Sequence, residues 1–216
     1  MCVVAMASLI FHMSGKSHFD DAGLILLGLF FLPLLLLVAQ EIEMPGGIKI
    51  QLRDIKDDLT SNIESDRYTE RGTIHLYTLK QYDSAISYFK KAIQLDPSNS
   101  LAIGRYASAL RRKYEKTKDT AYLENAYDLI AEAIEDGHKD ETLHFNRACY
   151  RSMLEEKKLK EQCKESEDQI FQDLKFALDR FDGFLSLAKE DGDLDYAKSE
   201  YKARFSKLIK RYEKPS

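Results

Sequence analysis

The stretch QYDSAISYFKKAIQLDPSN, residues 81–99, decides how the rest of the chain is interpreted. Small side chains stand at Ala85 and Ala92 and an aromatic one at Phe89, at offsets of zero, four and seven residues. Residues with this spacing lie on one face of an α-helix. Pro97 follows the last turn, where a proline cannot continue the helix. The stretch is therefore one amphipathic helix or one unit of a repeat.

The same spacing recurs twice further along the chain, which favours the repeat. Two more sets of marks share it: Ala126, Ile130 and Ala133, then Ile170, Leu174 and Ala177. An amphipathic helix is expected before each set, over residues 68–79, 101–116 and 142–159. Helix-ending residues such as Pro97 and Gly137 separate the helices. The pattern predicts an all-α fold built from about three helix–turn–helix units.

These units resemble tetratricopeptide repeats (TPRs). The first unit carries the family marks at Gly72, Tyr82, Ala85, Phe89, Ala92 and Pro97. It departs from the family spacing by one extra residue between Gly72 and Ala85. The second unit has an insertion around TKDTAYL, and the third carries a charged extension, EEKKLKEQCKESED. The resemblance implies a helical-repeat solenoid of about three helix pairs plus a capping helix, within a domain over residues 60–216.

The resemblance also implies a binding groove, lined by the first helix of each pair. Grooves of this kind hold peptides or helices of other proteins. The corresponding positions here hold Thr69, Thr73, Ser108, Arg111, Phe145 and Cys149. The family's clamp for peptide carboxylates uses Lys and Asn, and its Asn positions are Thr73, Ser108 and Cys149 in this chain. We therefore expect a protein partner of another kind than a chaperone tail.

A basic run, Arg111-Arg112-Lys113, is the most polarised short stretch of this domain. Cations near the C-terminal end of a helix interact favourably with its dipole, so the run fits a solvated helix end. Alternatively, it contacts an acidic partner segment or the anionic face of a membrane. The sequence leaves both interpretations open.

The N-terminal residues predict a membrane anchor over residues 1–40. Residues 22–40, AGLILLGLFFLPLLLLVAQ, carry no charge. A helix of that length spans roughly 28 Å, close to the thickness of a bilayer's hydrocarbon core. Residues 2–13 are also apolar but too short to cross alone. We expect a transmembrane helix over residues 22–40, preceded by a short first arm or by an apolar tail.

Basic residues near the span predict its orientation. Lys16 precedes it, whereas Lys49, Arg53 and Lys56 follow it. The excess places the C-terminal side in the cytoplasm by the positive-inside rule. Residues 41–59 alternate apolar and polar around a Pro-Gly-Gly turn, which fits a small hairpin or an irregular linker at the membrane surface. A header that ends in PGGIKI is similar to those of bacterial membrane proteins, which implies the cell inner membrane.

Motifs that carry catalysis, cofactors or metals are missing. The chain contains no HExxH, no GxSxG and no glycine-rich dinucleotide fingerprint. The spacings of His138, His144, Cys149 and Cys163 match no common zinc site. A net charge of −4 argues against a protein that coats nucleic acid. We expect no enzymatic activity, no cofactor, no metal, no nucleic acid and no small-molecule substrate.

The anchor and the repeats together predict a membrane-anchored scaffold or adaptor that recruits a partner protein. In the alternative, the anchor senses the membrane and the repeats relay the signal to an effector, as in a regulatory subunit. A third interpretation is an enzyme with an unrecognised site.

Overall fold

The computed structural model describes residues 41–44, 48–157 and 166–213, and it divides into two compact units, Met1–Leu59 and Thr60–Ser216. The predicted transmembrane helix, residues 22–40, and the short arm, residues 2–13, lie outside the described residues. Among the residues that are described, no helix is both long enough and apolar enough to cross a membrane.

The first unit contains a two-stranded antiparallel sheet. Strand β1 (Glu41–Met44) pairs with β2 (Ile48–Gln51), and Met44 lies opposite Ile48 at the turn end. Helix α3 (Leu52–Thr73) begins at the residue after β2. The sequence was compatible with either a small hairpin or an irregular linker over residues 41–59. The structure has the two strands and the beginning of α3 there.

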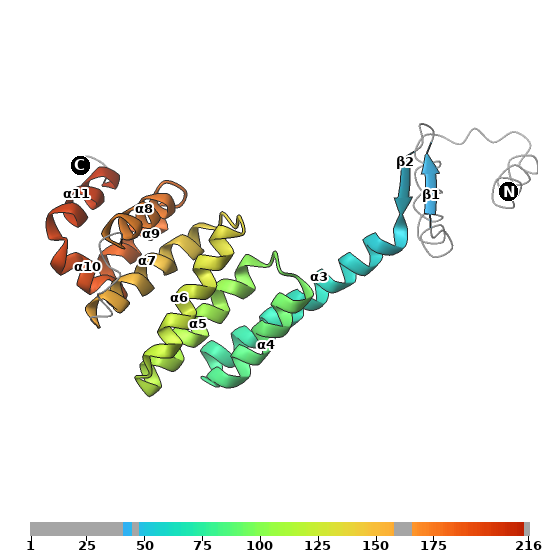
Figure 1. The fold of residues 1–216 in the computed structure, drawn as a ribbon, viewed down its shortest axis with the longest axis horizontal. Helices are drawn as coiled ribbons and strands as arrows, with labels where there is room; N and C mark the ends of the chain where they lie inside the picture. The colour runs from blue at the N-terminus through green and yellow to red at the C-terminus, as the bar shows by residue number, and fades with distance from the viewer. Residues whose placement is uncertain (1–40, 45–47, 158–165, 214–216) are drawn as a thin grey trace, which may run out of the picture. The chain divides into compact units, whose positions relative to one another are not determined.

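The residues of Thr60–Ser216 that the structure describes form helices, turns and loops without a strand, which confirms the predicted all-α class for this part of the chain. After α3 come a π-helical turn η1 (Ile74–Thr78), α4 (Tyr82–Leu95), α5 (Ser100–Thr117), α6 (Thr120–Glu135), α7 (Glu141–Glu156) and α8 (Ser166–Leu178). The chain ends with α9 (Gly183–Glu190), a 3₁₀ turn η3 (Gly192–Leu194), α10 (Asp195–Glu200) and α11 (Lys202–Tyr212). From α4 to α8 each helix packs on the next in chain order, and α5 also contacts α7 (Figure 1).

Side-chain caps begin the helices in the middle of this unit. The Asn99 carboxamide accepts a hydrogen bond from the Ala102 N–H, and the Asp119 carboxylate accepts one from the Ala121 N–H. The Asp140 carboxylate accepts from two backbone N–H groups at the start of α7. Each cap satisfies a backbone donor that lacks a partner within its own helix, so these three side chains stabilise the starts of α5, α6 and α7.

The repeated marks form the centre of the packing. All nine are at most 5% exposed: Ala85, Phe89, Ala92, Ala126, Ile130, Ala133, Ile170, Leu174 and Ala177. They lie on α4, α6 and α8, the second helices of the predicted pairs. Small side chains at these positions let neighbouring helices approach closely. The marks therefore hold helices together and present no surface to a ligand.

The extra residue between Gly72 and Ala85 coincides with the π-helical turn η1. There the Leu79 N–H donates to the Ile74 carbonyl, five residues back, at 3.1 Å. A π-turn holds one residue more than an α-turn, so it absorbs a one-residue insertion without moving the flanking packing. Gly72 can therefore still face the ring of Phe89, where a Cβ atom would come within 2.6 Å of the ring.

Candidate partner-binding face

The first-helix face is the surface formed by α3, η1, α5 and α7, where the sequence places the groove residues. Thr69 and Thr73 begin it, and each hydroxyl donates to the backbone carbonyl four residues earlier. Thr69 is only 3% exposed, because it lies beside the Asn99 carboxamide at the start of α5. Of the two threonines, only the half-buried Thr73 retains surface that a partner could reach.

Ser108 and Arg111 follow on α5. The Ser108 hydroxyl donates to the Gly104 carbonyl at 2.9 Å and is half-buried. The Arg111 guanidinium bonds the Asp193 carboxylate, and the same group lies 3.1 Å from the Glu115 carboxylate. Arg111 therefore meets two acids of its own chain, one of them from a segment more than 80 residues away.

Phe145 and Cys149, on α7, are buried at 4% and 2% exposure. The Phe145 ring stacks on Phe184, with ring centroids 4.8 Å apart. Burial raises the pKa of the Cys149 thiol well above its ordinary value, so this cysteine is inert while the fold is closed. Neither side chain presents surface to a partner in this structure.

The chain's own C-terminal part covers these residues. We call α9, η3 and α10, residues 183–200, the covering segment. Both η3 and α10 pack on α7, and the Ala197 N–H donates to the Ser152 hydroxyl at 3.2 Å. Three covering residues, Ala188, Leu194 and Ala197, are fully buried. The part of the first-helix face that contains Arg111, Phe145 and Cys149 is thus occupied from within the molecule.

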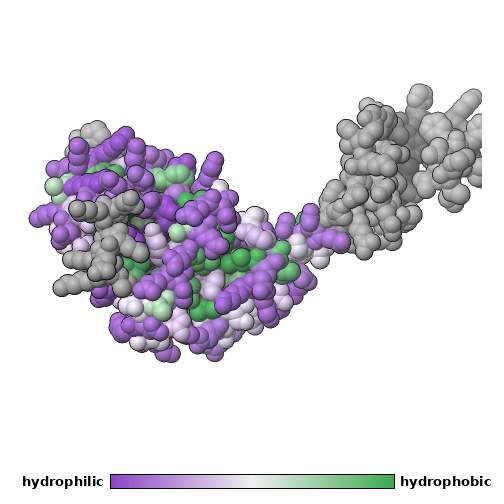
Figure 2. Space-filling model, viewed as in Figure 1, coloured by the Kyte–Doolittle hydropathy of each residue, from purple (hydrophilic) through white to green (hydrophobic). Residues whose placement is uncertain are grey.

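The part of the face nearer the N-terminus remains open. We call Tyr77, Leu101, Arg105 and Arg112 the open stripe. Tyr77 is 45% and Leu101 58% exposed, and the Arg105 guanidinium lies over the Tyr77 ring at 4.9 Å from its centroid. Among the described residues of Thr60–Ser216, five of the seven exposed large apolar side chains lie between Ile63 and Leu101. Figure 2 shows apolar surface gathered over α3 to α5 on the face in view, bordered by hydrophilic side chains.

The basic run Arg111-Arg112-Lys113 is largely paired within the chain. The Arg112 guanidinium lies 3.0 Å from Glu115, and the Lys113 ammonium bonds the exposed Asp83 and also lies over the Tyr122 ring. Arg111 has the two acids described above. Of these three cations, only Arg112 has a substantially exposed side chain, at 46%. The run therefore contributes one accessible charge to the face, at Arg112.

A buried polar cluster between α7 and α8 was not found from the sequence. The Arg147 guanidinium donates two hydrogen bonds of 2.8 Å to the two oxygens of Asp173, and His144 Nδ1 lies 2.7 Å from one of them. Asp173 is 1% exposed, and the His144 ring stacks on Phe176 at 3.7 Å. Fully paired charges of this kind fix how two helices dock, so we interpret the cluster as structural.

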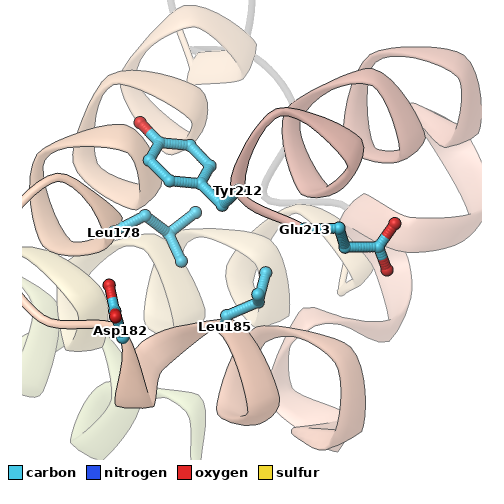
Figure 3. A pocket seen from close by; sticks show the side chains of 5 residues that line it. All are labelled: Leu178, Asp182, Leu185, Tyr212 and Glu213. Carbon is cyan, nitrogen blue, oxygen red and sulfur yellow. The ribbon is translucent and has the colours of Figure 1, made fainter. Parts of the chain in front are cut away.

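The C-terminal helices line an open pocket of about 580 Å³ between α8, α9 and α11. Leu178, Leu185 and Tyr212 form its apolar part, while Asp182 and Glu213 stand at its margin; in Figure 3 the Glu213 carboxylate points away from the leucines. The Tyr212 hydroxyl donates to the Asp179 carboxylate. Burial and this hydrogen bond raise the pKa of Tyr212 to about 12, so the phenol stays protonated at neutral pH.

In the described part of the chain, no three His, Cys, Asp or Glu side chains are grouped so that they could hold a metal ion. No protein-family model matches this chain, and no curated protein is significantly similar to it. The TPR resemblance therefore rests on the marks of residues 68–181 alone.

Proposed function

We propose that this protein is a membrane-anchored, TPR-like scaffold that binds a partner protein through its first-helix face and has no enzymatic activity. The anchor is the apolar stretch of residues 22–40, and the folded unit Thr60–Ser216 lies on the cytoplasmic side of the inner membrane. Such a protein needs no cofactor, small-molecule substrate or nucleic acid.

The observation that carries the proposal is the open stripe. Exposed aromatic and arginine side chains are the residues most enriched in the energetic centres of protein interfaces. Here the half-buried Arg105 of α5 lies over the ring of the exposed Tyr77 in η1, on consecutive first helices. The contact leaves both side chains ordered before a partner arrives, which lowers the entropy cost of binding. Leu101 adds an exposed apolar side chain on the same helix as Arg105.

Photo-crosslinking in intact cells tests the proposal. A photo-reactive amino acid at Leu101 should give a discrete crosslinked band in the membrane fraction, and the additional change Arg105→Glu should abolish it. Gln94, which is exposed on α4, serves as the matched control position and should give no such band. Bands of equal intensity from both positions, or a band that survives Arg105→Glu, would refute a partner at the open stripe.

Protease accessibility tests the orientation separately. In inverted inner-membrane vesicles, protease added outside should digest the folded unit, whereas in right-side-out vesicles the unit should remain intact. The opposite pattern would place the unit outside the cytoplasm.

A further inference from the structure

The covering segment lies over the very residues of the first-helix face that the sequence pattern assigns to partner binding. Three contacts define how it sits. Phe184 stacks on Phe145 with the ring planes 25° apart, Asp193 bonds Arg111, and the Ala197 backbone N–H donates to the Ser152 hydroxyl. An aromatic stack, a charge pair and a backbone hydrogen bond are the contacts by which a groove holds a peptide.

The ion pair between Arg111 and Asp193 is unusual for a contact whose only role is to cover a hydrophobic core. The side chains of Arg111 and Asp193 are 15% and 12% exposed. Buried ion pairs are seldom more stabilising than apolar side chains of similar volume, but they select one partner geometry. Arg111 also lies 3.1 Å from Glu115, on its own helix. If Asp193 leaves, the guanidinium therefore keeps a carboxylate beside it, and the segment can be exchanged without leaving a buried charge alone.

The covering segment is also built from short pieces. Helix α9 has eight residues, η3 has three and α10 has six, whereas α5, α6 and α7 have sixteen to eighteen. Helices this short are marginal in water, so contacts with the rest of the molecule hold them in place. A competing segment that makes the same contacts can therefore displace them.

We propose that the face around Arg111, Phe145 and Cys149 is a binding site for a partner segment that carries an aromatic side chain and a carboxylate, and that the covering segment occupies this site until the partner arrives. The aromatic group takes the place of Phe184 on Phe145, and the carboxylate takes the place of Asp193 on Arg111. This inference rests on the proposed scaffold function and extends its partner surface from the open stripe to α7.

Cys149 reports on this site, because it is 2% exposed and its thiol is close enough to Asp191 and Asp193 of the segment for their charges to help raise its pKa, alongside burial. In the full chain with Cys2→Ser and Cys163→Ser, it is the single thiol, and its rate of maleimide labelling measures opening. We expect Asp193→Arg to raise that rate by about tenfold or more, because it sets two like charges side by side in a buried site. Asp195→Arg, the same change at a 75%-exposed carboxylate of the segment, is the matched control and should leave the rate within about twofold.

In the second part of the experiment, the covering segment is added back as a separate peptide. A synthetic peptide with the sequence of residues 183–197 should slow the labelling of the Asp193→Arg variant, whereas peptides with Phe184→Ala or Asp193→Arg should not. If Asp193→Arg prevents folding, Phe184→Ala removes the other anchor and is measured in the same way.

Three results would overturn the proposal. In the first, Asp193→Arg labels no faster than Asp195→Arg. In the second, labelling has the same urea dependence as global unfolding, so the segment is a fixed part of the core. In the third, the peptide gives no protection. These measurements use the purified chain, so they are independent of the crosslinking experiment: a missing crosslink at Leu101 with intact peptide protection would refute only the partner at the open stripe.

Discussion

At the scale of single residues, Gly72 provides the sharpest stability test. A Cβ atom there would come within 2.6 Å of the Phe89 ring, and Phe89 is fully buried, so the ring has no free space to move into. Overpacking of this kind costs about 1–3 kcal/mol. Alanine in a helix regains up to about 1 kcal/mol of this cost, so we expect Gly72→Ala to lower the free energy of unfolding by a net ~1–2 kcal/mol, as measured by urea denaturation followed by circular dichroism.

Gly104 is the matched control for Gly72. It is also buried in a helix, but a Cβ atom there would lie 3.4 Å from a Leu143 methyl group, at ordinary contact distance. Replacing a helical glycine by alanine typically gains up to about 1 kcal/mol. Gly104→Ala should therefore leave the free energy of unfolding unchanged or raise it. Equal losses from both substitutions would show that the close contact with Phe89 is not the cause.

Asp193 gives a pH dependence whose sign follows from its pKa. Burial raises the pKa of this carboxyl above its ordinary value of 3.8, and the hydrogen bond from Arg111 opposes the rise only in part. The folded chain therefore holds the proton more tightly than the unfolded chain. The stability that the raised pKa of Asp193 contributes to the folded state is fully present below pH 3.8 and is lost as the pH rises through the folded-state pKa.

Removing the ionisable group isolates this effect. Relative to Asp193→Asn, the wild-type chain should lose stability as the pH rises from about 4, the ordinary aspartate range. Urea unfolding of both proteins across the pH range gives the difference, and a carbon-13 NMR titration of the carboxyl gives the pKa itself. A carboxyl that titrates at or below its ordinary value would contradict the expectation.

At the scale of helices, the cluster of His144, Arg147 and Asp173 fixes how α7 docks on α8. Asp173→Ala would leave the buried Arg147 guanidinium without the carboxylate that accepts its two hydrogen bonds. Removing one partner of a buried pair costs about 3–5 kcal/mol. We expect Asp173→Ala to lower the free energy of unfolding by that amount in urea denaturation.

Asp168 supplies the comparison on the same helix. Its carboxylate pairs with Arg204 at 2.7 Å, but its side chain is 70% exposed. Exposed pairs contribute about 0–1 kcal/mol, so Asp168→Ala should cost less than 1 kcal/mol. Similar losses at both positions would show that burial of the α7–α8 cluster does not govern its contribution.

The helices of this unit could largely be predicted from the sequence, because burial periodicity is local. The first helices expected over residues 101–116 and 142–159 correspond to α5 and α7, and all nine repeated marks are buried. Helix α3 begins at Leu52, before the expected helical stretch, and α7 ends at Glu156, three residues early. Helix ends depend on caps and on the next element, so periodicity alone places them only to within a few residues.

The covering segment and the buried cluster could not be predicted in the same way. Asp193 and Arg111 are 82 residues apart in the sequence, and no spacing pattern predicts that they form a pair. The C-terminal residues had the pattern of a capping helix, but the structure divides them into η3, α10 and α11, of which η3 and α10 pack on α7 and α11 packs on α8 and α9. Contacts between distant residues depend on the path of the whole chain, which a periodic pattern does not contain.

At the scale of the unit Thr60–Ser216, the first-helix face has two parts with different access. Tyr77 and Arg105 are available on the open stripe, whereas Phe145 lies under the covering segment. A partner that binds the open stripe first would then be positioned to compete for the covered residues. Both parts lie on the same array of helices. A single partner that binds both parts therefore makes its second contact intramolecularly, which increases its overall affinity.

The packing of this unit also predicts an uneven stability along the chain. One large cluster of buried side chains extends from α5 to α11, whereas a small one joins Leu76, Ala85, Phe89 and Ala109 at the N-terminal end. In arrays of helix pairs each pair is held mainly by its neighbours, and regions with few buried contacts open at the lowest free energy. We expect the amide hydrogens of α4 to exchange faster than those of α6 and α7, as measured by hydrogen exchange with mass spectrometry.

The substitution Phe89→Ala tests whether the first helix pair opens separately from the other helices. The loss of a buried phenylalanine costs about 3–5 kcal/mol. If the first pair opens separately, the substitution should accelerate exchange in α4 and in the last turns of α3, and leave α6 and α7 nearly unchanged. Ile130→Ala, at the equivalent mark of α6, should instead accelerate exchange through the large cluster. If Phe89→Ala accelerated amide hydrogen exchange equally in all helices, the unit would open only as a whole. The small cluster would then be coupled to the large cluster as strongly as the parts of the large cluster are coupled to each other.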